Sequence, residues 1–189
     1  MSSGTTEEGA GPGEGRGPLA HLQAMFDEWV LGLSARVVFA GTLLVYYINS
    51  ATTKVGDGVF GVLNPSAGAF AQIVPPIAEN YVYDTSAIPI FPWHAVVILG
   101  TVSEFVLPAL LVLGLFTRVA AFGMLVFVVV QTFVDVAFHG SGLGAWFNTA
   151  PGDLVDERAL WIFLFLVLSI RGAGRLSVDA LLFGRAKAP

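Results

Sequence analysis

A few ionisable and amide side chains lie inside stretches of this chain that are otherwise almost entirely apolar. The clearest are Glu104, Gln131 and Asp135, each within a long run of valine, leucine, phenylalanine and alanine. Burying such a group in lipid costs several kcal/mol unless it finds a partner or water. An acid within a membrane span is by default a candidate proton or ligand site, so these residues are the first candidates for chemistry.

The spacing of neighbouring polar residues extends this set. Gln131, Asp135 and His139 follow one another at four-residue steps, which on a helix places them in a stripe roughly 80° wide. Such a stripe must face other helices or a wet cavity. Charged and imidazole groups also stand near the ends of the other apolar runs, so the predicted polar pocket consists of Glu104, Gln131, Asp135, His139, Lys54, Arg158, Glu157 and His94.

Two interpretations of this pocket stay open. In the first, it binds a ligand or moves protons. In the second, it is only a salt-bridge network that aligns the helices, with Lys54 or Arg158 paired to Asp135 or Glu157. For Glu104 the alternatives are a functional acid and a protonated side chain that donates to a carbonyl or to a polar group of the first helix.

The elements that must position these residues are transmembrane helices. Two apolar segments, about 93–115 and 119–138, are each long enough to cross the hydrocarbon core, which needs about 20 residues. The short turn at Phe116, Thr117 and Arg118 makes them antiparallel neighbours. Further segments at about 35–53 and 157–171 complete the prediction of an all-α, polytopic membrane protein with an antiparallel four-helix transmembrane bundle and short interfacial helices.

The composition supports one membrane domain. The chain is 55% hydrophobic and 12% charged, against about 25% charged residues in soluble domains. It has no cysteine, which excludes disulfides, thiol nucleophiles and thiolate metal sites. The net charge of −5 without a clustered basic face argues against nucleic acid as a partner.

Several kinds of active site are not expected either. His94 belongs to one predicted helix and Asp135 and His139 to the end of another, without ligand spacing, so no metal site is predicted. The sequence also lacks a catalytic triad, a nucleotide-binding loop and a haem motif. An independent enzyme is therefore not the expected activity, and any redox role would require a bound cofactor, a quinone or a partner subunit.

Composition also divides the chain. Residues 1–18 are rich in Gly, Glu and Ser, which predicts a disordered N-terminal tail without a signal-peptide pattern. The membrane domain covers 19–183 and begins with an interfacial helix at 19–34, anchored by Trp29. The long connection after Lys54 is expected to contain a short helix at 66–73. Ser177 is expected to cap a last helix at 178–183, and residues 184–189 form a C-terminal tail.

The distribution of basic residues predicts the orientation. With four spans, both termini lie on the side of the turn between the second and third spans. Because an excess of Lys and Arg marks the cytoplasmic side, we expect a multi-pass protein of the inner (cytoplasmic) membrane with both termini in the cytoplasm and the polar pocket open to the outer face. The outer side carries Lys54 and Arg158, and the cytoplasmic side carries Arg16, Arg36, Arg118, Arg171, Arg175, Arg185 and Lys187.

Two segments carry a resemblance to a known family. The run from Glu104 to Arg118 (EFVLPALLVLGLFTR) and the segment from Arg171 to Asp179 (RGAGRLSVD), together with a Lys that closes the first span, resemble the DoxX family of small membrane proteins over about residues 35–182. Ala173 stands where the family commonly has Pro, and the Gly usually found before the Lys is missing. The resemblance implies a link to membrane redox or quinone chemistry.

Three functions follow as hypotheses. The first is an accessory subunit of a membrane redox system, with a quinone as the candidate cofactor and redox subunits or a second copy of the chain as candidate partners within the lipid bilayer. The second is a structural or assembly scaffold of a membrane complex with no chemistry of its own. The third is a small-solute or proton pathway that uses Glu104 and Asp135.

Overall fold

The regular structure of the protein is helical. The computed structural model describes residues 17–26, 30–144 and 154–184, and these residues contain no strand. The all-α class is therefore confirmed. Trp29 and most of the two predicted tails lie outside the described residues.

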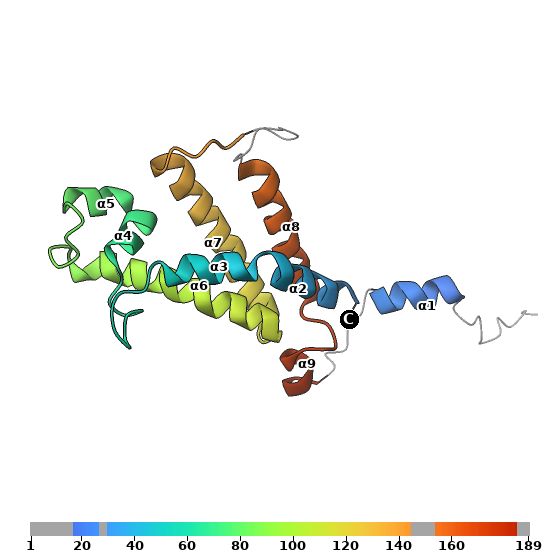
Figure 1. Ribbon diagram of the computed structural model, residues 1–189. Helices are drawn as coiled ribbons and strands as arrows, with labels where there is room; N and C mark the ends of the chain where they lie inside the picture. Colours follow the sequence, from blue (N-terminus) through green and yellow to red (C-terminus); the bar gives the residue numbers. More distant parts are fainter. Residues whose placement is uncertain (1–16, 27–29, 145–153, 185–189) are drawn as a thin grey trace, which may run out of the picture.

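The helices follow one another in an order close to the predicted one (Figure 1). The predicted interfacial helix at 19–34 appears as α1, which projects away from the other helices in Figure 1, and as the beginning of α2. In chain order the elements are α1 (Pro18–Met25), α2 (Leu31–Thr42), α3 (Leu44–Thr52), α4 (Ala67–Ile73), α5 (Pro75–Asn80), a π-helical turn (Ile90–His94), α6 (Ala95–Leu113), α7 (Thr117–Phe138), α8 (Leu154–Arg171) and α9 (Val178–Leu182).

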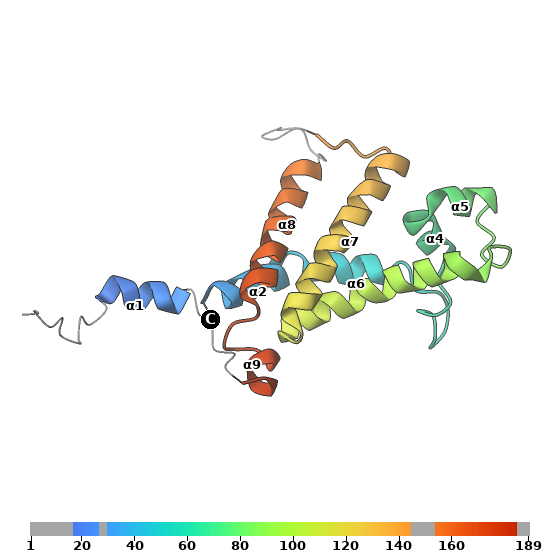
Figure 2. The ribbon, with the colours of Figure 1, turned by 180° about the vertical axis from the view of Figure 1, so that it is seen from behind.

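The number of candidate membrane spans is two or three among the described residues. The helix formed by 90–113 and α7 are each long and apolar enough to cross a membrane, and α2 with α3 makes a third if the bent pair is one span. α8 contains Asp156, Glu157, Arg158 and Arg171 in its 18 residues, too many charges for the same criterion. Figures 1 and 2 show α7 and α8 side by side and slanting across the layer of α2, α3 and α6. The predicted four-helix bundle is therefore not confirmed.

The first predicted span is bent and not continuous. α2 and α3 meet at Leu43 with an angle of 45° between them. At this point the Thr42 hydroxyl donates to the Val38 carbonyl at 2.7 Å. A Thr side chain that bonds back to the carbonyl one turn earlier often bends a helix, and this bond lies directly before the change of direction.

The turn between α6 and α7 has three residues, Gly114 to Phe116. α6 ends at Gly114, which has a φ of 69°, and α7 already begins at Thr117, two residues before the predicted start of that span. The Asp179 carboxylate accepts hydrogen bonds from the backbone N–H groups of Phe116 and Thr117 at 2.6 and 2.9 Å. A side chain from the far end of the chain therefore caps α7, which explains its early start.

Arg36 holds the same end of the molecule together. Its guanidinium donates to the carbonyls of Leu111 at 3.0 Å, of Ala173 at 3.2 Å and of Leu176 at 2.6 Å. The positive charge of Arg36 at the C-terminus of α6 also interacts favourably with the negative end of the helix dipole. A Cβ at Gly114 would lie 2.8 Å from the Arg36 Cζ atom, so a glycine is required here.

Two hydrophobic cores support the helices. The larger lies between α2, α3, α6, α7 and α8 and includes the fully buried Phe39, Tyr47 and Phe165. The smaller includes Phe70 and Val97 and joins α4 and α5 to the start of α6. The long connection is therefore a structured cap at this end of the fold.

Serine side chains cap two short helices, and the cap by Ser177 is the predicted one. α4 begins after Ser66, whose hydroxyl accepts from the Ala69 N–H at 3.2 Å, and α9 begins after Ser177, whose hydroxyl accepts from the Ala180 N–H at 3.1 Å. Pro75 not only follows α4 but occupies the first position of α5, where proline is tolerated because that N–H has no partner within the helix.

Candidate functional site

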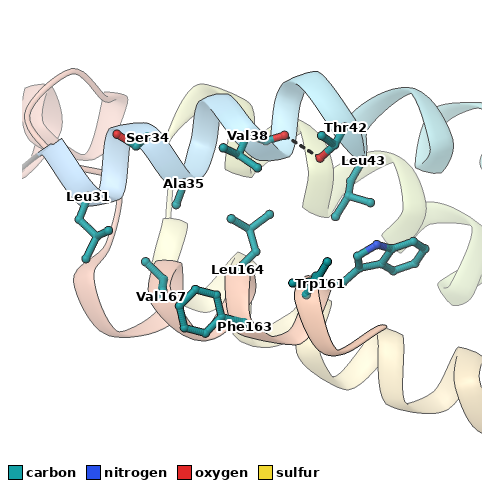
Figure 3. A pocket seen from close by; sticks show the side chains of 11 residues that line it. Leu31, Ser34, Ala35, Val38, Thr42, Leu43, Trp161, Phe163, Leu164 and Val167 are labelled. Carbon is teal, nitrogen blue, oxygen red and sulfur yellow. Dashed lines mark hydrogen bonds between the residues drawn. The ribbon is translucent and has the colours of Figure 1, made fainter. Parts of the chain in front are cut away.

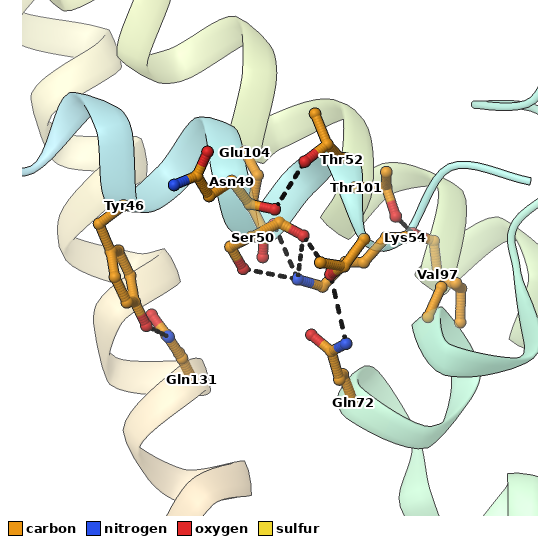
Figure 4. A network of polar contacts seen from close by, with 12 residues as sticks. Tyr46, Asn49, Ser50, Thr52, Lys54, Gln72, Val97, Thr101, Glu104 and Gln131 are labelled. Atoms are coloured by element: carbon orange, nitrogen blue, oxygen red, sulfur yellow. Dashed lines mark hydrogen bonds and ion pairs between the residues drawn. The ribbon is translucent and has the colours of Figure 1, made fainter.

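The first ion pair joins Lys54, two residues after the end of α3, to Glu104 of α6. Lys54 Nζ lies 2.9 Å from Glu104 Oε2, and the two side chains are 3% and 5% exposed. The ammonium also donates to the hydroxyl of Ser50 at 2.7 Å and to its carbonyl at 3.1 Å (Figure 4). An ammonium has three N–H donors, and here all three have acceptors. This pair is complete within the chain.

The second ion pair joins α7 to α8. Arg158 Nη2 donates to Asp135 Oδ2 at 2.8 Å, and the two side chains are 7% and 24% exposed. The guanidinium also lies over the Trp161 ring, with Cζ 4.5 Å from the ring centroid. The remaining Nε and Nη1 atoms of Arg158 are buried and have no hydrogen-bond partner among the described residues. This pair leaves hydrogen-bonding capacity unused.

Aromatic side chains surround the second pair. The rings of Tyr46 and Tyr47 lie 5.2 and 6.1 Å from the Trp161 ring, between centroids. Gln131 donates to the Tyr46 hydroxyl at 2.8 Å, as Figure 4 shows. The Tyr47 hydroxyl and Gln131 Oε1 are buried without a partner among the described residues. We call Tyr46, Tyr47, Gln131, Asp135, Arg158 and Trp161 the α7–α8 polar cluster.

The side chains of the other predicted pocket residues have different surroundings. His94 packs edge-on against Phe70 with ring centroids 4.8 Å apart, within the cap. His139 is exposed, with Nε2 3.3 Å from the Gln72 carbonyl oxygen. Glu157 is exposed. The structure therefore pairs Lys54 with Glu104 and Arg158 with Asp135, whereas the side chains of His94 and His139 contact other residues.

Metal ligands do not converge in the part of the chain that the structure describes. No group of three His, Asp or Glu side chains there could hold an ion. The candidate site is thus made of two ion pairs and an aromatic cluster, and its available chemistry is hydrogen bonding and charge compensation inside an apolar layer.

An apolar groove borders the α7–α8 polar cluster. It runs between α2 and α8, has a volume of about 470 Å³, and is lined mainly by aliphatic side chains. Figure 3 shows Trp161 beside Leu43 at one end of the groove and Leu31 near the other. Trp161 therefore belongs both to the groove wall and to the cluster.

The sequence did not indicate the roles of Tyr47 and Trp161 in the cluster or of Arg36 near the α6–α7 turn. Tyr47 and Trp161 lie in apolar runs, where an aromatic residue is typical of an ordinary core. Arg36 was counted only as a cytoplasmic charge, yet it is 8% exposed and bonded to several carbonyls. The one available signal was Tyr47 itself, because buried Tyr hydroxyls usually need a partner.

These features define a helical, multi-pass membrane protein with ion pairs inside its apolar layer. The DoxX family model matches residues 31–140, from the start of α2 to just beyond α7. The chain belongs to the DoxX family, as its motifs indicated. No curated protein and no solved structure matches the chain.

Proposed function

We propose that this DoxX-family protein is an accessory subunit of a membrane redox system and holds a lipid-soluble quinone at the α7–α8 polar cluster. The observation that supports this is the Arg158–Asp135 pair, whose guanidinium keeps two buried N–H groups unpaired among the described residues. Asp135 is 24% exposed, and the unpaired nitrogens of Arg158 lie behind it in the interior.

The protein has no thiol that could form a disulfide, because cysteine is absent from the sequence. We propose that its redox chemistry comes from a bound molecule. When bound, a quinone supplies reversible two-electron, two-proton chemistry. The residues present fit this group, because Arg158 and Tyr47 offer unused donors to carbonyl oxygens and the aromatic rings offer flat surfaces.

We further propose four spans, with α8 as the fourth. Its charged residues are at its two ends: Arg158 is neutralised by Asp135, and Arg171 ends the helix, where it can extend to the headgroups. Because basic residues are in excess on the side of both termini, we propose that this side faces the cytoplasm. The membrane is then the inner membrane of the cell. The polar cluster then lies toward the outer face.

A scaffold role is the second candidate, and a specific observation favours it. The Lys54–Glu104 pair is fully satisfied and links two helices. A complete pair of this kind aligns helices without any ligand. The complete Lys54–Glu104 pair gives no support to the proton or solute pathway, because that hypothesis uses Glu104 as a group that exchanges protons.

Purification in a mild detergent tests the proposed function. We expect redox subunits and a quinone to accompany the wild-type chain, and the quinone to be lost from the Asp135→Asn, Arg158→Gln double variant while the subunits remain. His139→Asn, outside the cluster, is the control and should retain both. If partner subunits are recovered without any quinone, the scaffold role is favoured. If neither partner subunits nor a quinone are recovered, the proposal is refuted.

A further inference from the structure

The loop between α3 and α4 presents three large apolar side chains to the outside of the fold. Val59, Phe60 and Leu63 are 97%, 76% and 62% exposed, and they lie close together in the chain, within residues 59–63. Apolar surface in contact with water is unfavourable roughly in proportion to its area. Neighbouring apolar side chains that are this exposed mark an interaction surface more often than scattered ones do.

The loop has a defined shape that begins and ends at α3. The Ser66 N–H donates to the Lys54 carbonyl at 3.0 Å, so the chain leaves the end of α3 and returns to it. Inside the loop, the Gly56 N–H donates to the Gly61 carbonyl at 3.0 Å, and the Gly61 N–H donates to the Gly58 carbonyl at 3.1 Å. These bonds hold the loop in one conformation.

Glycines allow the loop to close so tightly. A Cβ at Gly61 would lie 2.0 Å from the Gly56 carbonyl oxygen, so a larger residue does not fit there. Gly58 has a φ of 86°, in the left-handed region that favours glycine. Val59 and Phe60 occupy the short turn between Gly58 and Gly61, and their exposed fractions show that both side chains point away from the fold.

The loop also satisfies part of its own backbone. The Leu63 N–H donates to the Phe60 carbonyl at 2.8 Å, and the Asn64 N–H donates to the Gly61 carbonyl at 3.2 Å. Backbone groups need partners within the protein wherever water is scarce. A loop with internal hydrogen bonds and an apolar tip therefore suits the boundary of a bilayer, where side chains enter the hydrocarbon and the backbone stays near the headgroups.

The position of the loop indicates lipid as its partner. Figures 1 and 2 both show the connection between α3 and α4 extending past α6 on the side away from α7 and α8. α6 belongs to a candidate membrane span. Its Leu99 side chain is 68% exposed, as expected of a residue that faces acyl chains. The loop therefore extends from the helices in a direction in which α6 adjoins lipid.

The charges of the connection exclude attraction to anionic headgroups as the cause of binding. Residues 55–92 contain no Lys, Arg or His, and their charged residues are Asp57, Glu79 and Asp84. Binding to anionic lipid headgroups requires clustered basic residues. The transfer of apolar side chains into hydrocarbon is the driving force that these residues can supply.

We propose that the tip of the α3–α4 loop inserts into the bilayer beside α6, with Val59, Phe60 and Leu63 among the acyl chains and the loop backbone at the headgroup boundary. Insertion fixes the height of the cap formed by α4 and α5, because the same loop leads directly into α4. This inference uses only the position of α6 in the membrane. It is independent of the quinone site and of which side faces the cytoplasm.

Site-directed spin labelling tests the insertion, because the chain has no cysteine and any introduced cysteine is unique. Phe60→Cys and Leu63→Cys replace exposed side chains, so both variants should fold as the wild type does. Each is labelled with a nitroxide, and the purified full chain is placed in phosphatidylcholine nanodiscs. The collision rate of the label with oxygen, which dissolves in hydrocarbon, is compared with that for a nickel chelate, which stays in water.

Two further labelled variants give the reference values. Leu99→Cys on α6 reports lipid, and Glu79→Cys, exposed on α5, reports water. We expect the oxygen-to-nickel ratios at residues 60 and 63 to match the ratio at residue 99. They should exceed the ratio at residue 79 roughly tenfold, because polar solutes are excluded from hydrocarbon.

Ratios at residues 60 and 63 that match the lipid reference support the inference. Ratios equal to that of Glu79→Cys overturn it, because the tip then lies in water. Low collision rates with both reagents also overturn it, because the tip is then covered by protein, either a second copy of the chain or a partner subunit. The proposed function is tested by the quinone recovered on purification, so its failure leaves these ratios unchanged.

Discussion

At the scale of single residues, the two ion pairs differ in how completely they are satisfied. Lys54 and Glu104 use their charges and hydrogen bonds on each other and on Ser50. Arg158 uses one nitrogen on Asp135 and leaves two without partners among the described residues. A satisfied pair is sufficient to align helices without a ligand, whereas buried donors without partners require a separate explanation, such as a bound molecule or water.

The satisfied pair leads to a stability prediction. Glu104→Gln leaves the Lys54 ammonium buried and without a compensating charge, which costs about 3–5 kcal/mol when one partner of a buried pair is removed. The double variant Lys54→Met, Glu104→Leu removes both charges and should recover most of that loss. Thermal unfolding in detergent measures both.

Ser103→Ala is the control for this prediction, because the Ser103 hydroxyl donates only to the carbonyl one turn earlier on α6. It should unfold within a few degrees of the wild type. Wild-type stability in Glu104→Gln would show that the pair contributes nothing to alignment, and Glu104 would regain its place among the functional candidates.

At the scale of elements, residues 171–179 close the end of the helices opposite to the cap. Asp179 caps α7 and donates its own N–H to the Gly114 carbonyl at 2.8 Å, while Arg36 reaches the carbonyls of α6 and of the segment before α9. The two motifs that resemble the family therefore contact each other. Their physical role is to join the α6–α7 turn to the segment after α8.

The cap of α7 can be tested by one substitution. Asp179→Ala removes the acceptor of two backbone N–H groups at the start of α7, and losing an N-cap costs about 1–2 kcal/mol. We expect faster amide hydrogen exchange in the first turn of α7, while the middle of the helix keeps its protection. Asp179→Asn retains an acceptor oxygen, so its amide exchange rate in the first turn of α7 should lie between those of the wild type and Asp179→Ala. Unchanged exchange in Asp179→Ala would refute the cap.

At the scale of the whole molecule, the arrangement differs from a compact bundle. α7 and α8 pack side by side and slant across α2, α3 and α6, while α4 and α5 cover the beginning of α6 (Figures 1 and 2). The polar groups form two ion pairs, one between Lys54 and α6 and one between α7 and α8. Tyr46 of α3 links to the second pair's helices through its contacts with Gln131 and Trp161.

The proposed four-span topology makes a prediction at this scale. Reporter fusions that are active only in the cytoplasm should be active at both termini and after residue 116, and inactive within the connection at residues 55–92. The physical reason is the excess of basic residues on the side of the termini. Termini on opposite sides would remove α8 from the spans and would also overturn the proposed orientation of the polar cluster.

Local properties of the sequence determined the class of this protein. A long apolar run indicates a transmembrane helix by its own length and composition, because the length of a span follows from the thickness of the bilayer. The helix caps of Ser66 and Ser177 are likewise local, because each serine bonds three residues ahead. The family was also evident from two short motifs.

Only the tertiary structure decided which polar groups meet. Lys54 and Glu104 are 50 residues apart, and Arg36 lies 140 residues from Leu176. Helical periodicity gives the face on which a side chain lies, but it does not give the helix that packs against that face. The bend at Leu43 and the slant of α7 and α8 determine those contacts, which is why the sequence predicted one pocket and the structure has two separate ion pairs.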